Sequence, residues 1–389
     1  MQALEGLLDR LCCPVQRSPL ALVDQHDLRL INVGIAGGRA RYADGAPVTE
    51  VLDGGLATVD GSSLYRIEDG VPVLVQGLRI LRLADAQQVS ETGPPTQISQ
   101  LADVWLELSR RWGRINPPLR PAPQDIELFE RLVDTVAQDA GPAPRVLLLG
   151  VTPEIATMRW PAGTRLLALD SSPAMIRTVW PAGEARDAVV ARADWKAMPV
   201  RDGACDVVIG DGILTSQRFP NDVLALASEV RRVVKDSGAF VMRLFARPET
   251  NEPLGGVFQD LRAGRIPNFD VFHWRLAMAV HRDTTSGTRL GDVWEAWQEN
   301  VPMPAELLAS LGWAPDAARI LETYRSSATL ISFPTVVEVR DTLAQDFDQT
   351  ACHIPEYESG DRYPTVLFRP RRHSARRDAM RGPSPGRAH

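Results

Sequence analysis

The chain has 389 residues, of which 44% are hydrophobic and 24% charged, and its net charge at neutral pH is −6. These values are ordinary for globular proteins and exclude a disordered, collagen-like or coiled-coil chain, while the length predicts two to three domains of about 150 residues. No run of about 18 apolar residues is present, so we expect no membrane span. The first residues lack a secretory signal, and the scattered cysteines predict free thiols in a cytoplasmic protein; they are Cys12, Cys13, Cys205 and Cys352.

The first part of the chain is rich in short strand-like runs. They follow an amphipathic start at Leu4, Leu7, Leu8 and Leu11, are separated by Asp-Gly turn signals, and lie at 20–23, 28–32, 57–59, 63–67 and 71–75. Residues 83–100 then carry few apolar side chains and two consecutive prolines, which is typical of a linker. We therefore predict a small, strand-rich α+β domain at 1–82 and a linker at 83–100.

The middle of the chain predicts an α/β doubly wound sheet. Continuous apolar runs spaced by helix-sized segments are what parallel strands covered on both faces require. They lie at 145–150, 165–170, 188–192, 205–210 and 239–245, after predicted helices at 105–112 and 125–138. Further helices are expected at about 252–264, 288–299 and 304–325. This second domain is expected to span 101–370 and to be followed by a basic, disordered tail at 371–389, which has six arginines against one aspartate.

Four polar or small residues close these predicted strands: Gly150, Asp170, Asp194 and Asp211. Ligands of open parallel sheets bind at the carboxyl ends of the strands, near the point where the strand order reverses. A carboxylate at the position of Asp170 can accept hydrogen bonds from both hydroxyls of a ribose. Asp194 and the neighbouring Trp195 offer an acceptor for an exocyclic amine and an aromatic face, so together these residues suit an adenosine group.

The same region resembles the class I S-adenosylmethionine-dependent methyltransferases. The resemblance rests on Val146-Leu-Leu-Leu-Gly150, Leu167-Ala-Leu-Asp170, Arg192-Ala-Asp-Trp195, the segment from Met198 to Asp211, and the segment from Glu229 to Gly238. It implies a Rossmann-like seven-stranded sheet that ends in an antiparallel hairpin, for which 328–335 and 364–370 are the candidates. It also implies S-adenosylmethionine as cofactor, Asp211 and Gly212 near the sulfonium or the substrate, and a cofactor site at Gly150, Thr152, Glu154, Asp170, Ser171, Asp194, Trp195 and Asp211.

The first turn of the predicted sheet departs from this family's pattern. It reads Gly150-Val-Thr-Pro-Glu154, with one glycine where three small residues are usual. Pro153 lacks an amide donor, and Glu154 adds a negative charge that could meet the amino group of the cofactor. The alternative function is therefore a non-catalytic scaffold or binding partner that has lost the cofactor. A nicotinamide-dependent oxidoreductase is disfavoured because no Gly-x-Gly-x-x-Gly follows the first strand.

The first domain resembles the small zinc-ribbon-like proteins that activate methyltransferases. The matching segments are Leu7 to Pro14, Ser18 to Leu20, and Tyr65 to Leu74. Gln16 stands where that family has a second cysteine, and no later cysteine pair occurs before Cys205, so four soft ligands cannot be assembled and we expect no metal. A fused activator implies an intramolecular contact between the two domains.

Catalytic residues are not defined by any motif, and Asp211 and His273 are the candidates. Tyr324 and Tyr357 could contact a substrate, and residues 114–120 could cover the cofactor pocket; simple packing is the alternative for each of them. The methyl acceptor stays open among small molecules, proteins and RNA, and the sequence also leaves open a homodimer.

Overall fold

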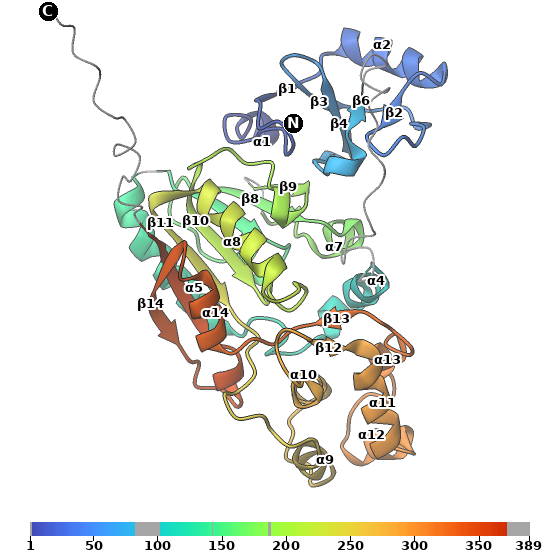
Figure 1. Ribbon diagram of the computed structural model, residues 1–389, viewed down its shortest axis with the longest axis vertical. Helices are drawn as coiled ribbons and strands as arrows, with labels where there is room; N and C mark the ends of the chain where they lie inside the picture. The colour runs from blue at the N-terminus through green and yellow to red at the C-terminus, as the bar shows by residue number, and fades with distance from the viewer. Residues whose placement is uncertain (1, 82–101, 142, 186–187, 372–389) are drawn as a thin grey trace, which may run out of the picture.

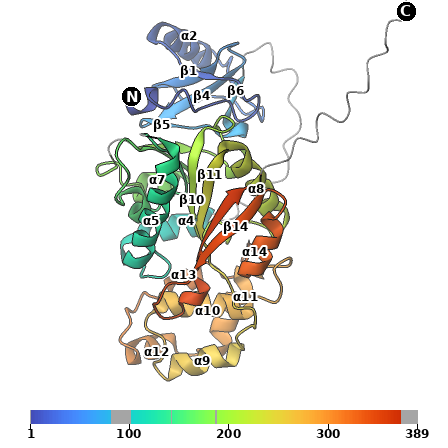
Figure 2. The same cartoon turned by 90° about the vertical axis from the view of Figure 1, so that its left-hand side faces the viewer.

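The computed structural model describes residues 2–81, 102–141, 143–185 and 188–371. Three parts follow one another along the longest axis of the molecule: an N-terminal unit, a large twisted sheet with helices on both faces, and a helical cap at 254–331 (Figures 1 and 2). The predicted linker at 83–100 and nearly all of the predicted tail at 371–389 lie outside the described residues.

The N-terminal unit is built on a six-stranded antiparallel sheet in the order β1-β3-β4-β6-β2, with β5 paired to β4. Its elements are α1 (Gln2–Glu5), β1 (Leu20–Leu22), α2 (Gln25–Ala36), β2 (Arg41–Tyr42), β3 (Gly55–Thr58), β4 (Ser63–Glu68), β5 (Val71–Pro72), η1 (Gln76–Leu78) and β6 (Ile80–Leu81). The prediction of a strand at 28–32 is wrong, because these residues lie in α2. Asp24 caps this helix by accepting the N–H of Asp27, and Leu28 and Ile35 are buried on one face.

The large sheet has seven strands in the order β14-β15-β11-β10-β7-β8-β9. The five strands from β11 to β9 run parallel, whereas β15 is antiparallel to both of its neighbours. The strands are β7 (Arg145–Leu149), β8 (Arg165–Asp170), β9 (Val189–Arg192), β10 (Cys205–Asp211), β11 (Val234–Arg243), β14 (Phe347–His353) and β15 (Thr365–Pro370). This is the Rossmann-like doubly wound fold that the sequence predicts.

The predicted position of the outer strand of the closing hairpin is wrong. Residues 328–335 were expected there, but β13 (Leu330–Ile331) pairs with β12 (Thr288–Arg289) within the helical cap. The outer strand is Phe347–His353, which is largely exposed and polar, as befits a sheet edge. Such a strand lacks the apolar run by which the buried strands are detected.

Helices cover both faces of the sheet. One face packs against α8 (Asn221–Val233) and α14 (Val336–Leu343), and the other packs against α5 (Pro123–Ala140), α6 (Pro153–Ala156) and α7 (Pro173–Val179). Successive residues of β7 point to opposite faces: Leu147 and Leu149 belong to the first core, Val146 and Leu148 to the second. The unalternating apolar run follows from burial on both sides.

The helical cap has its own apolar core and closes over the carboxyl ends of the strands. It contains α9 (Leu254–Arg262), α10 (Phe269–Val280), α11 (Leu290–Asn300), α12 (Pro304–Ser310) and α13 (Arg319–Glu322), and α4 (Ala102–Arg111) with η3 (Trp112–Arg114) packs beside it. The single helix expected at 304–325 is therefore two short helices. The remaining short helices are η4 (Trp195–Ala197) and η5 (Gly360–Arg362).

Candidate active site

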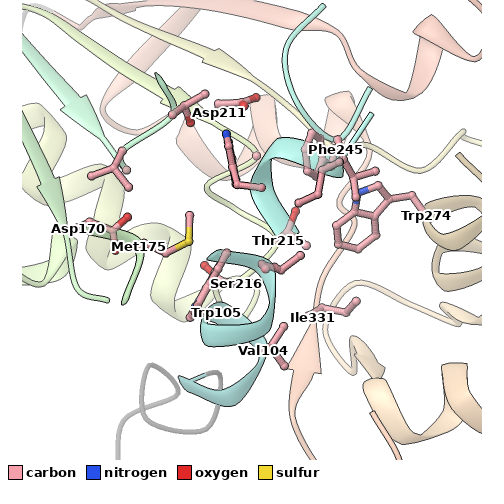
Figure 3. Close-up of a pocket in the computed structure, with 18 of the residues that line it drawn as sticks. Val104, Trp105, Asp170, Met175, Asp211, Thr215, Ser216, Phe245, Trp274 and Ile331 are labelled. Carbon is pink, nitrogen blue, oxygen red and sulfur yellow. The ribbon is translucent and has the colours of Figure 1, made fainter. Parts of the chain in front are cut away.

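The strand order reverses between β7 and β10, and a pocket opens there between the sheet and the helical cap, with about 1030 Å³ of space that is partly continuous with solvent. Switch points of this kind are the usual ligand sites of doubly wound sheets. Asp170 and Met175 line one side of the pocket, Phe245 and Trp274 line the other, and Thr215 lies between them (Figure 3). The end of β8 and helix α7 therefore supply one wall, and the segment after β11 together with α10 of the cap supplies the opposite one.

The turn after β7 has its single glycine in a left-handed backbone conformation with open space beside it. Gly150 has φ +102°, a conformation open mainly to glycine, and its N–H donates to the carbonyl of Leu169 at 2.8 Å. A Cβ at this position would meet no atom within 4 Å, so the space beside the turn is open. Thr152 follows at the start of α6, and both residues line the pocket.

Asp170 ends β8 with its carboxyl group inside the pocket wall. Its Oδ1 accepts the N–H of Ser172 at 2.8 Å, and among the described residues no Lys, Arg or His forms an ion pair with it. Burial without a counter-charge raises the pKa of Asp170 to about 7. Asp170 also lines a smaller adjoining cavity of about 470 Å³ together with Ser171, Asp194 and Trp195.

Asp194 and Trp195 are fixed by short hydrogen bonds at the end of β9. The Asp194 side chain accepts the N–H of Lys196 at 2.9 Å and so caps η4. Trp195 Nε1 donates to the carbonyl of Leu169 at 2.7 Å, which holds the indole against the strand end. The structure thus brings Gly150, Asp170 and Trp195 around one pocket, as the strand-end argument predicts.

Asp211, a candidate catalytic residue, is engaged in a buried ion pair. Arg243 Nε donates to Asp211 Oδ1 at 2.7 Å, and Arg243 Nη1 donates to the carbonyl of Pro118 at 2.8 Å. Burial raises the pKa of Asp211, and the guanidinium opposes that rise. This pair ties the fourth strand end to the segment at 114–120, of which Ile115 and Leu119 line the pocket.

Glu154 does not line the pocket, although the first turn led us to expect it near the cofactor. Its carboxylate is paired with Arg120, whose Nη1 also donates to the carbonyl of Trp112. Glu154 therefore helps to anchor the same 114–120 segment over the first turn.

His273 and Tyr324 form a buried pair on the cap side of the pocket. His273 Nε2 and the Tyr324 hydroxyl are 3.0 Å apart, and burial lowers the pKa of His273 to about 3. The imidazole is therefore neutral at physiological pH and a weak base. Tyr357 does not line this pocket; its hydroxyl donates to Asp125.

Sequence reasoning missed much of the cap side. Thr215, Ser216, Phe245 and Trp274 line the pocket, as do Val104 and Leu108 from α4. These residues belong to no short motif, and their convergence depends on how the cap folds back over the sheet. The only available signals were the aromatic residues of the predicted helix at 105–112 and of 272–274.

No group of three or more His, Cys, Asp or Glu side chains that could hold a metal ion occurs in the described part of the chain. In the N-terminal unit, Cys13 Sγ lies 3.1 Å from the Tyr65 hydroxyl, where both groups are buried.

Within 2–81, 102–141, 143–185 and 188–371, no helix combines the length and apolar character needed to cross a membrane.

Residues 148–242 match a family model described as a methyltransferase domain. This segment runs from β7 to β11 and contains the strand ends described above. The sequence matches no curated protein.

Solved structures that match this chain include an N-methyltransferase, NodS, from Bradyrhizobium japonicum in complex with S-adenosylhomocysteine. It is 10% identical, with 69% of this chain and 98% of that chain covered and a TM-score of 0.38. A chain of the complex between the Haloferax volcanii Trm112 methyltransferase activator and its proposed methyltransferase is 14% identical, with coverage of 68% and 96% and a TM-score of 0.34. A Xylella fastidiosa protein solved by NMR is 32% identical, with coverage of 23% and 90% and a TM-score of 0.17.

The fold and the matched segment define a Rossmann-like α/β enzyme of the class I methyltransferase type. The reaction is transfer of a methyl group from S-adenosylmethionine to an acceptor.

Proposed function

We propose that Asp170 binds the two ribose hydroxyls of S-adenosylmethionine, that the Gly150 turn with Thr152 adjoins its amino-acid part, and that Ser171, Asp194 and Trp195 frame the adenine. The observation that carries this proposal is Asp170 itself, a buried carboxylate in the pocket wall whose partners are backbone N–H groups. A carboxylate can accept about four hydrogen bonds, so capacity for two hydroxyl donors remains.

The test is isothermal titration calorimetry of the whole chain with S-adenosylmethionine and S-adenosylhomocysteine, with NAD as control. We expect both adenosyl compounds to bind with micromolar or tighter Kd and NAD at least tenfold more weakly. A folded chain that binds neither adenosyl compound would favour the scaffold alternative, for which the single-glycine turn Gly150-Val-Thr-Pro-Glu154 is the supporting observation.

When bound, S-adenosylmethionine supplies a methyl group activated by a sulfonium. The protein has to align the acceptor and exclude water, and such positioning alone can provide much of the acceleration. We propose that the cap wall and the segment at 114–120 align the acceptor. Arg243 holds this segment through the Pro118 carbonyl, and Glu154 holds it through Arg120. His273 is assigned to the wall as well, because a base with a pKa of about 3 removes protons poorly at neutral pH.

We also propose that residues 1–82 are a metal-free activator-like unit fused to the methyltransferase domain at 101–370, with 83–100 as linker and 371–389 as tail. Support comes from the outer edge of the large sheet, which is formed by β9. There Val73 of the N-terminal unit forms a parallel bridge with Arg192, and the Leu74 N–H donates to the Arg192 carbonyl at 2.8 Å. Arg192 Nε in turn donates to the carbonyl of Ser171 at 3.1 Å. The unit thus covers an exposed strand edge and contacts the residue that holds the loop after Asp170.

The cytoplasm remains the compartment that we propose, because all four cysteines are free thiols and three of them are buried. A homodimer remains a prediction that analytical ultracentrifugation of the chain would test.

A further inference from the structure

The cap side of the pocket is apolar, aromatic and without net charge. Of the residues that line the whole pocket, only Asp170 and Asp211 carry formal charge within the described chain. Asp211 is neutralised by Arg243, and Asp170 lies on the side opposite Phe245 and Trp274 (Figure 3). His273 is neutral at physiological pH. A charged ligand placed on the cap side would therefore lose its hydration without gaining a counter-charge.

The aromatic rings of this wall pack closely against one another. Trp274 packs on Phe245 and Phe333, with ring centroids 5.6 and 5.1 Å apart, and stacks on His273 with an interplanar angle of 6°. Phe245 also meets Tyr363 edge to face. Rings locked by packing of this kind present a preformed flat surface to a ligand.

Two buried polar atoms of this wall have no hydrogen-bond partner among the described residues. They are Thr215 Oγ1 and Trp274 Nε1, and the indole Nε1 of Trp112, a further pocket-lining residue, also has no partner among the described residues. Thr215 is held in place through its backbone, because its carbonyl accepts the Ser332 N–H at 3.0 Å and its N–H donates to the Gly212 carbonyl. Buried polar groups normally have partners, so an unmatched pair lining a pocket indicates a ligand that completes them.

The hydrogen-bonding chemistry of the two atoms limits which class of ligand can satisfy both of them. The indole Nε1 only donates, whereas a threonine hydroxyl both donates and accepts. An uncharged hydroxyl or carbonyl oxygen satisfies both atoms, while an ammonium group offers Trp274 no acceptor. A carboxylate would accept from both but would remain a buried, uncompensated charge.

We propose that the cap side of the pocket, formed by Thr215, Phe245, Trp274 and Tyr324, is the acceptor subsite and takes an uncharged aromatic small molecule with a hydroxyl or carbonyl oxygen bound to Thr215 and Trp274. This assignment rests on the proposed function, since it presumes that the cofactor occupies the side of Asp170. It disfavours charged peptide side chains as the group methylated, because this wall offers them no counter-charge.

The test is calorimetry of the whole chain, saturated with S-adenosylhomocysteine, against 2-naphthol and against 2-naphthoate, the anionic analogue. We expect 2-naphthol to bind at least tenfold more tightly. Trp274→Phe and Thr215→Val should each weaken 2-naphthol binding about fivefold, the effect of one lost hydrogen bond. Affinity for S-adenosylhomocysteine should change less than threefold in both variants.

Matched controls lie in the same cap. Trp294 Nε1 and Thr288 Oγ1 are also buried without a partner among the described residues, but neither residue lines the pocket. Trp294→Phe and Thr288→Val should leave 2-naphthol binding within twofold. Equal or tighter binding of 2-naphthoate, or equal losses in the control variants, would overturn the assignment. Failure to bind S-adenosylhomocysteine would instead refute the proposed function, and titration of 2-naphthol into the unloaded chain would still test the subsite.

Discussion

Arg10 of the N-terminal unit donates from Nη2 to the carbonyl oxygen of Val146 at 3.1 Å, in the first strand of the large sheet. Its Nη1 donates to the carbonyl of Arg165 at 2.7 Å, and the side chain is completely buried. One guanidinium therefore bridges the adjacent strands β7 and β8 from a residue more than 130 positions away. The N-terminal unit and the large sheet share a core, which also includes Leu11 and Leu74.

Replacement of Arg10 by Ala should lower the free energy of unfolding by about 2–4 kcal/mol, because it removes packing and leaves two buried carbonyl groups without their charged donor. Denaturant unfolding followed by tryptophan fluorescence would measure the change. Arg39→Ala, at an exposed position of the same unit, should change it by less than about 0.5 kcal/mol. A loss for Arg10→Ala as small as that of this control would contradict the account of the shared core.

Cleavage of the chain at a protease site introduced between residues 83 and 100 should leave the two pieces associated. Besides Arg10, the Arg17 guanidinium pairs with Glu229 at 2.9 Å and donates to the Met198 carbonyl. Gel filtration after cleavage, with intact chain as reference, would check this prediction. Elution as two separate species would show that the interface is too weak for a stable unit.

The parallel strands could be predicted from the sequence because burial on both faces leaves continuous apolar runs, as at Arg145–Leu149 and Arg165–Asp170. The helix at Gln25–Ala36 was mistaken in part for a strand because the short segment 28–32, with apolar Leu28, Leu30 and Ile31, fits both periods. The edge strand Phe347–His353 could not be seen, because its residues are mostly exposed.

The residues of the candidate site also fall into two groups, those that local sequence can place and those that it cannot. Asp170 and Trp195 follow strands directly, so local sequence places them at the sheet edge. Thr215 and Trp274 line one pocket only because of how the cap packs on the sheet, and the ion pair between Asp211 and Arg243 depends on a neighbouring strand. Contacts of that kind leave no local pattern.

Gly212→Ala should destabilise the chain by about 1–3 kcal/mol. Gly212 has φ +61°, and a Cβ there would lie 2.8 Å from the Phe245 ring, so the substitution strains the backbone and displaces the aromatic wall. Thermal unfolding would report the loss. Gly255→Ala, in α9 with open space at the Cβ position, is the control and should be neutral or slightly stabilising. Equal stability of the two variants would contradict the close approach of Phe245.

Binding of S-adenosylhomocysteine should strengthen as pH rises through about 7, the pKa to which burial raises Asp170. Ribose hydroxyls donate to the carboxylate form, so binding should release a proton at pH 6 and almost none at pH 8.5. Calorimetry in two buffers with different ionisation enthalpies measures that release. Equal proton release at both pH values would contradict the assignment.

The same group has the opposite effect on the stability of the unliganded chain. Its folded pKa lies above the unfolded value of about 3.8, so the folded state binds the proton more tightly and loses stability as pH rises from about 4 to 7. Asp170→Asn should therefore be more stable than the natural chain at pH 8 and similar to it at pH 4, as measured by urea unfolding. A variant that is less stable at pH 8 would refute this reading.

The most direct test of the cofactor site is the affinity of Asp170→Ala for S-adenosylhomocysteine, measured by calorimetry at pH 8 beside Glu306→Ala, an exposed carboxylate of the cap. If Asp170 holds the ribose, the first variant should bind about 1.5–3 kcal/mol more weakly, which is roughly a 10- to 150-fold rise in Kd, and the second should match the natural chain. Unchanged affinity in a folded Asp170→Ala chain would contradict the account.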